Sequence, residues 1–469
     1  MPDLESLLAD QRDASERRLM ELLAIPSVSA DSSCSGSVNQ AADWVADRLK
    51  AVGRGGGALA VEKIATDGNP IIYAESPPVP GAPVALVYGH YDVQPPDPLD
   101  EWISPPFEPT VRDGNVYARG ATDDKGQMLT HVESVAALLD PRCSDTAGKL
   151  PLQVKFLIEG EEEVGSPSLE PFVTANRDRL ACDVVVISDS SQFAPGVPAI
   201  TYGLRGIAYY ELRLQGPSQD LHSGTFGGGV TNPANVLVKM LAALVDDQGR
   251  VRVPGFYDDV VPLAAAERDE FAGLPFSEER FAEQLGVDGF TGEAGYTTLE
   301  RRWARPSCDI SGLWSGYRGE GAKTVLPAKA GAKFSFRLVP NQDPAKVTAG
   351  VRELLEPLVP PGVEMELIDF HGAPGVVFPF DSPVVEAAKR AIGSGFGASP
   401  VLIREGGSIP IVEAFSRELG AEVLLLGWGL DDDNTHSPNE KFCLADFHRG
   451  IHASACLWGE LAKTGSRDG

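Results

Sequence analysis

The chain has 469 residues, of which 43% are hydrophobic and 23% are charged, a composition that is ordinary for a globular protein. This length exceeds what one compact core usually holds, so we expect two domains. The formal net charge of −27 excludes a nucleic acid or an anionic membrane as a partner, because phosphate groups would be repelled at long range.

The N-terminal segment and the cysteines bear on where the protein works. Residues 1–19 carry charges throughout and lack the apolar centre of a secretory signal. No apolar run approaches the ~20 residues that are needed to span a bilayer. The six cysteines are scattered without paired spacing, which favours reduced thiols over a disulfide framework. We therefore predict a cytoplasmic protein.

The predicted elements begin with two helices, over residues 3–24 and 39–52. Short apolar runs then predict buried strands, and helical stretches such as 126–139 and 383–392 separate several of them. The strands are predicted over 84–88, 154–158, 184–187, 401–403 and 423–426. This alternation indicates an α/β protein with a mostly parallel sheet and helices on both faces.

The middle of the chain has a different pattern. Residues 207–214 alternate between apolar and polar, as expected for an antiparallel strand with one buried face, and 232–244 follow as a helix. Residues 333–339, 345–358 and 363–370 predict strand, helix and strand. This βαββαβ-like unit predicts an inserted α+β domain of two layers at 207–373, which divides the main domain into residues 1–206 and 374–469.

Acidic and imidazole side chains follow the predicted strands. In an open α/β sheet, ligands bind outside the carboxyl ends of the strands. Carboxylates that converge there repel one another, and bound cations neutralise them most directly. The residues concerned are His90, Asp92, Glu161, Glu162, Glu163, Asp189, Asp431, Asp432, Asp433 and His436.

Several of these features also have simpler interpretations. We interpret Asp431–Asp433 as a solvated turn, because a short acidic run is usually a surface feature. Four further histidines have no carboxylate beside them at a strand end, so we interpret them as structural. They are His131, His371, His448 and His452.

Five ordered motifs resemble the aminoacylase, desuccinylase and carnosinase family of dinuclear metallohydrolases. The motifs are Gly-His90-Tyr-Asp92-Val-Gln-Pro, Arg119-Gly-Ala-Thr-Asp123-Asp124-Lys125-Gly126, Glu162-Glu163-Val-Gly-Ser, Ile-Ser-Asp189 and Thr-His436-Ser-Pro-Asn-Glu. The segments 200–206, 220–224, 321–325, 336–341 and 404–410 resemble its cytosolic non-specific dipeptidase and carnosinase branch most closely. Together the matches span residues 88–440.

The resemblance implies a zinc-peptidase-like catalytic domain that binds two divalent metal ions. Zinc is expected first, and manganese or cobalt are possible. His90 and Asp189 would hold one metal, Glu163 and His436 would hold the other, and Asp123 would contact both. The peptide bond between Asp123 and Asp124 would be cis.

Two residues beside the ligands would have roles of their own. Asp92 would orient the imidazole of His90, and Glu162 would act as the general base. In the alternative register, Glu161 is the base and Glu162 a ligand, which breaks the spacing to Gly165-Ser166.

The implied activity is hydrolysis of the peptide bond of dipeptides or very short peptides, by a hydroxide that the two metals share. The alternative is an amidohydrolase of N-acyl, N-succinyl or N-carbamoyl amino acids on the same site. Arg337 would receive the substrate carboxylate, with Thr324 and Ser408 as neighbouring contacts. Either Arg337 or Arg205 could instead be a structural ion-pair partner.

The inserted domain would serve as a lid and as the dimerisation domain. His222 would stabilise the oxyanion in the active site of the partner subunit. This role implies a homodimer formed through residues 207–373. A structural turn histidine is the other interpretation of His222.

Overall fold

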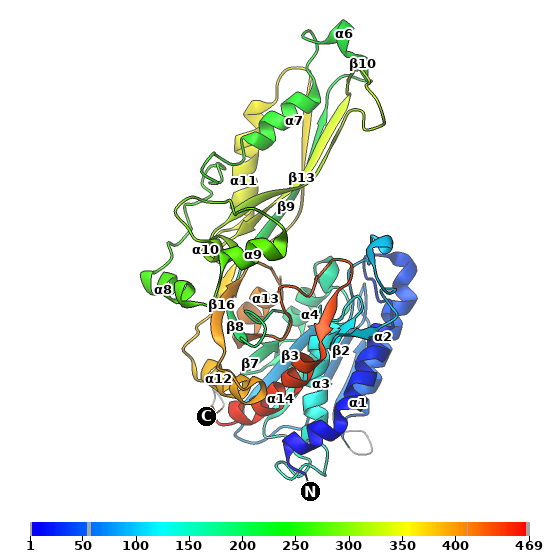
Figure 1. The fold of residues 1–469 in the computed structure, drawn as a ribbon, viewed down its shortest axis with the longest axis vertical. Helices are drawn as coiled ribbons and strands as arrows, with labels where there is room; N and C mark the ends of the chain where they lie inside the picture. The colour runs from blue at the N-terminus through cyan, green and yellow to red at the C-terminus, as the bar shows by residue number, and fades with distance from the viewer. Residues whose placement is uncertain (1, 54–57, 410, 466–469) are drawn as a thin grey trace. The chain divides into compact units, whose positions relative to one another are not determined.

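The computed structural model describes residues 2–53, 58–409 and 411–465. The chain forms two compact units (Figure 1). The first comprises Met1–Tyr202, Phe378–Ile403 and Ile411–Gly469, and the second comprises Gly203–Val377 and Arg404–Pro410. The short return of Arg404–Pro410 to the second unit was not anticipated from the sequence. The domain boundaries near Gly206 and Ala373 stay a prediction.

The first unit is built on a large sheet whose central strands are parallel. Strand β3 (Val84–His90) pairs in parallel with β6 (Gln153–Glu159) and β7 (Val184–Ile187), and β7 pairs in parallel with β17 (Glu422–Gly427). The order is β1-β2-β6-β3-β7-β17-β8-β15, and β16 also pairs with β8. The flanking strands are β1 (Ala60–Ile64), β2 (Ile71–Glu75), β8 (Ala199–Leu204), β15 (Val376–Val377) and β16 (Val401–Glu405). Of these, β1, β2, β8 and β15 pair antiparallel with their neighbours.

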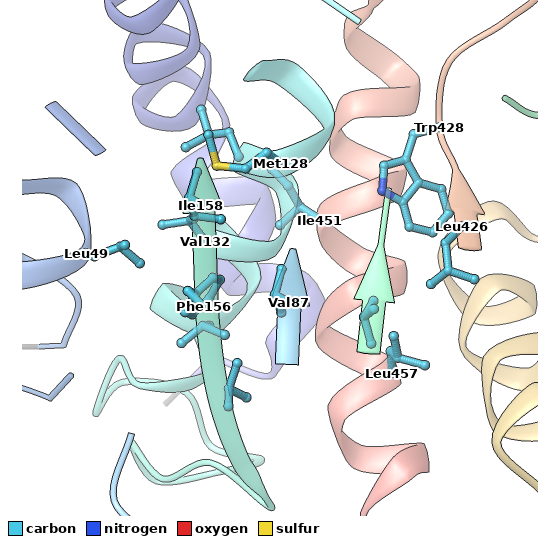
Figure 2. Packing of buried hydrophobic residues seen from close by; sticks show 14 of the residues in the cluster. Leu49, Val87, Met128, Val132, Phe156, Ile158, Leu426, Trp428, Ile451 and Leu457 are labelled. Atoms are coloured by element: carbon cyan, nitrogen blue, oxygen red, sulfur yellow. The ribbon is translucent and has the colours of Figure 1, made fainter. Parts of the chain in front are cut away.

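Helices cover both faces of this sheet. One face packs against α1 (Leu4–Leu23), α2 (Ser35–Lys50), α3 (Lys125–Leu138), α12 (Pro383–Phe396) and α14 (Leu444–Leu461). Figure 2 shows this core, where Val87 and Phe156 of the strands lie beside Met128, Val132 and Ile451 of the helices. The other face carries α4 (Leu169–Ala175), α5 (Arg177–Leu180) and α13 (Ile411–Leu419), with Phe415 against Tyr88. The predicted α/β class is confirmed.

A small three-stranded sheet lies beside the segments that will form the site. It has the order β18-β5-β4, with β4 at Thr110–Arg112, β5 at Asn115–Tyr117 and β18 at Lys441–Cys443. Because β5 and β18 pair antiparallel, the segments around residues 118–123 and 430–440 are held next to each other. Short 3-10 helices occur at Ser32–Cys34, Leu99–Glu101, Glu162–Val164 and Glu356–Leu358.

The second unit is a four-stranded antiparallel sheet with helices on one face. The strand order is β11 (Ser307–Ser315), β13 (Lys329–Leu338), β9 (Gly206–Gln215) and β14 (Glu364–Ala373). Helices α7 (Pro233–Ala242) and α11 (Pro344–Leu355) pack on it through a core that includes Tyr210, Phe334 and Phe336. The remaining elements are β10 (Leu221–His222), α6 (Ser223–Phe226), α8 (Ala265–Gly273), α9 (Glu278–Leu285), α10 (Thr298–Trp303) and β12 (Val325–Leu326).

Two sequence-based expectations can be compared with the described residues. None of their helices is long and apolar enough to cross a membrane. The six cysteines are all free thiols in the part of the chain that the structure describes.

Candidate metal centre

The acidic and imidazole side chains meet at the carboxyl ends of the central strands. His90 is the last residue of β3, and its Nε2 lies 3.2 Å from Oδ1 of Asp123. The other oxygen of Asp123 lies 2.9 Å from Nε2 of His436. His436 follows β17, and its Nε2 lies 3.4 Å from Oε2 of Glu163, which follows β6. Asp123 is therefore placed between two imidazoles.

Three of these residues have converging ligand atoms. One atom each of His90, Asp123 and Glu163 lies within 4.8 Å of the others. The three side chains are buried, with exposed fractions of 0%, 12% and 3%. Although burial opposes it, the neighbouring imidazoles of His436 and His90 hold the pKa of Asp123 below its usual value. Such a compact group of donors can hold a cation.

Asp189 faces the same group from the end of β7. Burial raises the pKa of Asp189 well above its usual value, and the carboxylates of Asp123 and Asp124 raise it further. The peptide bond between Asp123 and Asp124 is cis, as the resemblance implied. Repulsion between carboxylates of this kind is relieved when a cation binds them.

Asp92 connects His90 to the turn that carries the glutamates. Its carboxylate accepts hydrogen bonds from the backbone N–H groups of Glu162 (3.3 Å) and Glu163 (3.2 Å). Nδ1 of His90 lies 3.1 Å from the carbonyl oxygen of Asp92 and 3.4 Å from its Oδ1. Because two oxygen atoms of Asp92 face Nδ1, that nitrogen is a proton donor, and Nε2 is the nitrogen that faces the cluster and could bind a metal.

The three consecutive glutamates point to different places. Glu161 is buried and accepts backbone hydrogen bonds from Asn69 (3.0 Å) and Ser168 (3.2 Å), which ties two loops together. Burial raises the pKa of Glu162 well above its usual value; His90 opposes the rise, and Asp189 and other carboxylates add to it. Glu163 reaches His436 and accepts a hydrogen bond from Nε2 of Gln94 (2.7 Å). Glu161 therefore has structural partners, and the next two glutamates belong to the cluster.

The donor set fits a pair of divalent cations. Nε2 of His90 is fully buried and has no hydrogen-bond partner among the described residues, although a carboxylate oxygen is near. Imidazole nitrogens combined with carboxylate oxygens are ligands that zinc, manganese and cobalt accept. The residues that could hold two such ions are His90, Asp123, Glu163, Asp189 and His436.

In the second unit, Arg337 and Ser408 lie together. Nη1 of Arg337 donates to Oγ of Ser408 (3.0 Å), and that hydroxyl donates to the carbonyl of Arg205 (2.6 Å). The guanidinium of Arg205 itself donates to backbone carbonyls, among them that of Gly406 (3.2 Å). Burial lowers the pKa of Arg337, and Asp309 opposes this shift. Arg205 is thus a structural hydrogen-bond donor, whereas Arg337 keeps donors for a further acceptor.

His222 and Thr324 form a separate group in the same unit. His222 is exposed, and its Nδ1 accepts a hydrogen bond from the backbone of Gly224 (3.1 Å), so Nε2 is left as the donor nitrogen. The carbonyl of Thr324 accepts from the backbone of Ser223 (3.1 Å). These residues precede β13, and Arg337 stands near its far end. Eight residues from Lys329 to Arg337 correspond to about 26 Å along a strand.

The interpretation of Asp431–Asp433 as a solvated turn is wrong for its last residue. Asp433 is 1% exposed, and its Oδ2 accepts hydrogen bonds from Oγ1 of Thr122 (3.0 Å) and the backbone of Leu430 (2.9 Å). Lys441 pairs with its other oxygen at 3.1 Å. Asp431 and Asp432 are exposed. Asp433 is buried because the side chains of Thr122 and Lys441 provide donors that a turn in water would not have.

Three further histidines, whose side chains the structure describes, are not among the candidate ligands. Nε2 of His131 pairs with Oγ of Ser188 (2.8 Å), and Nε2 of His448 pairs with Glu16 (2.7 Å). His452 lines a cavity of about 330 Å³ beside α1 and α14. The side chain of His371 lies outside the described residues. Glu440 is fully buried beside the cluster, and no local signal in the sequence indicates a role for it.

The fold and the donor set together define a metal-dependent hydrolase. Residues 86–460 match the peptidase family M20/M25/M40, and the chain belongs to this family. It is 33% identical over 470 residues to a Cys-Gly metallodipeptidase of Schizosaccharomyces pombe, with 98% of each chain covered. It is 37% identical over 399 residues to the Beta-Ala-His dipeptidase of Homo sapiens, covering 84% of this chain and 78% of that protein.

A solved structure agrees with these sequence matches. The dipeptidase of Saccharomyces cerevisiae superposes with a TM-score of 0.86 at 31% identity, and 98% of each chain is covered. The resemblance that the motifs indicated is thereby confirmed.

Proposed function

We infer that the chain is a metallodipeptidase, which hydrolyses the peptide bond of dipeptides with the help of divalent metal ions. The observation that carries this proposal is the convergence of His90, Asp123 and Glu163 on one point, with His436 beside them. The dipeptidase names of the similar proteins favour dipeptides over N-acyl, N-succinyl or N-carbamoyl amino acids.

The proposed ligand set divides the cluster between two ions. His90 and Asp189 would hold one metal, Glu163 and His436 would hold the other, and Asp123 would contribute to both. Zinc is the proposed metal, and manganese and cobalt also suit one imidazole and two carboxylates per site. When bound, two such cations lower the pKa of a water molecule and polarise the carbonyl of the substrate.

The residues around the ligands handle protons and orientation. Glu162 takes the proton of the attacking water and returns it to the leaving amine, which a carboxylate beside the reacting centre can do. Asp92 keeps the imidazole of His90 in one orientation and, through the backbone of Glu162 and Glu163, keeps the base next to the ligand. This arrangement supplies a base that is not itself tied to the metal.

Substrate recognition is proposed for the second unit. The planar guanidinium of Arg337 suits two hydrogen bonds to the C-terminal carboxylate of a dipeptide. Ser408 limits the rotation of that guanidinium by accepting one of its N–H groups. Thr324, which directly precedes β12, contributes a further contact near His222 on the paired strand β10.

The distance within the second unit favours a homodimer. A dipeptide spans about 7 Å when extended. About 26 Å of β13 separates Arg337 from the group that contains His222. If both residues contact one substrate, His222 must therefore come from a second copy of the chain. We propose that residues 207–373 form this dimer, and that Nε2 of His222 donates to the oxyanion of the partner's substrate. The edge strand β11, which exposes Ile310 and Leu313 (50% and 58%), supports an interface on this domain.

A cytoplasmic location stays a prediction.

Metal content measured together with dipeptide turnover tests the proposal. Treatment with a chelator should abolish the release of amino acids, and zinc or manganese added back should restore it at two ions per chain. Turnover that is indifferent to chelation would refute the metal-dependent mechanism.

Subunit mixing tests the dimer. His222→Ala and Asp123→Asn should each be inactive, and an equal mixture should recover about one quarter of the wild-type activity after subunit exchange, because half of the dimers then hold one complete site. An inactive mixture, or an active His222→Ala protein, would contradict the role of His222 in the partner site.

A further inference from the structure

We propose that Glu440, which is not a metal ligand, is a positioning residue that fixes Asp123 relative to His436. This inference rests on the ligand set of the proposed function. Asp123 and His436 lie on two loops that are more than 300 residues apart in the chain. Both loops must be held in place if one carboxylate is to lie between two imidazoles.

The carboxylate of Glu440 binds the loop that leads to Asp123. Its Oε1 accepts hydrogen bonds from the backbone N–H groups of Thr122 (3.0 Å) and Asp123 (3.2 Å). Its Oε2 accepts from the backbone of Gly120 (2.8 Å) and from Nη1 of Arg119 (2.7 Å). The side chain is 0% exposed, so these four donors replace water completely.

A second carboxylate, on the loop that carries Glu440 and His436, strengthens the connection between the two loops. Asp433 accepts a hydrogen bond from the hydroxyl of Thr122 (3.0 Å) and pairs with Lys441 (3.1 Å). The backbone of Glu440 also accepts from Ala118 (3.1 Å), directly before the antiparallel pairing of Lys441 with Tyr117. The two loops are therefore joined at several points on both sides of His436.

The backbone around His436 needs such support. Three residues other than glycine adopt left-handed φ angles within six positions: Asn434 (57°), His436 (61°) and Asn439 (62°). This conformation is unfavourable for residues with a Cβ and persists where the surroundings hold it. His436 lies in neither a helix nor a strand, so its position depends on contacts such as those of Glu440.

A carboxylate with acceptor lone pairs on both oxygens matches this set of donors. All four groups around Glu440 donate, and a carboxylate offers lone pairs on both oxygens. Glutamine has nearly the same shape, but its NH₂ group would face two of the N–H donors and leave them without an acceptor. Glu440→Gln therefore changes the volume of the side chain little, but it removes hydrogen bonds that fix the loop of Asp123.

The variant should lose metal affinity more than stability of the fold. We expect Glu440→Gln to weaken zinc binding by about 10–100-fold, the effect that partners of metal ligands typically have. At limiting zinc the turnover should fall, and excess zinc should restore part of it. The matched control is Asp432→Asn, which removes one negative charge from the same loop at a side chain that is 53% exposed. Its zinc affinity should stay within about twofold of the wild type.

The dissociation constant for zinc should be measured on metal-free full-length protein by competition with a chromophoric chelator. Circular dichroism and thermal unfolding report the folded fraction. A residue that only stabilises the fold would lower this fraction and leave the dissociation constant of the folded protein unchanged.

The inference is overturned if folded Glu440→Gln binds zinc as tightly as the wild type, or loses no more affinity than Asp432→Asn. If Glu440→Gln does not fold, Glu440→Asp keeps the carboxylate and withdraws it by one CH₂ group from its four donors. A loss of affinity by about threefold or more in Glu440→Asp supports the inference, and wild-type affinity overturns it. If the wild type binds none of zinc, manganese and cobalt, the ligand set fails, and the role of Glu440 fails with it.

Discussion

Substitution of the proposed general base gives the most direct test of the catalytic arrangement. Glu162→Gln preserves the size of the side chain and removes its ability to accept a proton. General acid–base catalysis contributes about 10²–10⁴ in rate, which corresponds to about 3–5 kcal/mol of transition-state stabilisation. Because Glu162 is not a proposed ligand, we expect kcat to fall by this factor while the metal content stays at the wild-type value.

The neighbouring glutamate provides a matched control. Glu161 is also buried, but its oxygens accept the backbone N–H groups of Asn69 and Ser168 rather than facing the cluster. Glu161→Gln weakens hydrogen bonds to a charged group, which costs about 1–3 kcal/mol of folding stability. We therefore expect its melting temperature to fall and its kcat to stay within a few fold of the wild type.

The assay is dipeptide hydrolysis at saturating metal and substrate, followed by the release of free amino acids, with the bound metal quantified on the same samples. The opposite pattern would refute the reasoning. If Glu161→Gln loses two or more orders of magnitude in kcat while Glu162→Gln stays active, the base is Glu161 and the register of the motif is wrong.

Two further predictions concern pH and substrate recognition. Burial lowers the pKa of His131 to about 3, and its Nδ1 has no hydrogen-bond partner among the described residues. The folded protein therefore excludes a proton that the unfolded chain binds below about pH 6.5. The unfolding free energy is unaffected by this difference above that pH, and it decreases as the pH falls from about 6.5 toward 3. Between pH 8 and pH 5, the metal-free wild type should lose about 2 kcal/mol more unfolding free energy than His131→Gln in urea titrations, and equal losses would contradict this. Arg337→Ala should raise KM and lower kcat for dipeptides by a larger factor than for dipeptide amides, because the amides lack the charge that Arg337 recognises. Steady-state kinetics on both substrate types measures the two factors. Equal losses would exclude Arg337 as the residue that binds the substrate carboxylate.

The sequence by itself was sufficient for the elements that have a local signal. The apolar runs predicted β3, β6, β7 and β17, because a strand with both faces covered is mostly apolar along its length. An apolar run also predicted β16, although that strand is only partly buried. The position of His90, Glu163 and Asp189 directly after such strands predicts that they lie at one edge of the sheet. The ordered motifs then gave the family, which the comparisons confirm.

Other features depend on residues that are distant in the chain. The helix α14 was not predicted, and the burial of Asp433 contradicts its expected exposure. An acidic residue in a short run looks the same in the sequence whether it faces water or a buried threonine. Only the tertiary structure brings Thr122 within 3.0 Å of Asp433 and turns four donors toward Glu440.

The local sequence therefore determines which residues are candidate ligands, because this depends on the residue types that follow each strand. The environment that gives those ligands a fixed geometry is decided by the tertiary structure, since burial and hydrogen-bond partners are set by contacts across hundreds of residues. The same reason explains why the sequence left the roles of Arg205 and Glu161 open, because the backbone groups that each of them binds are set by tertiary contacts.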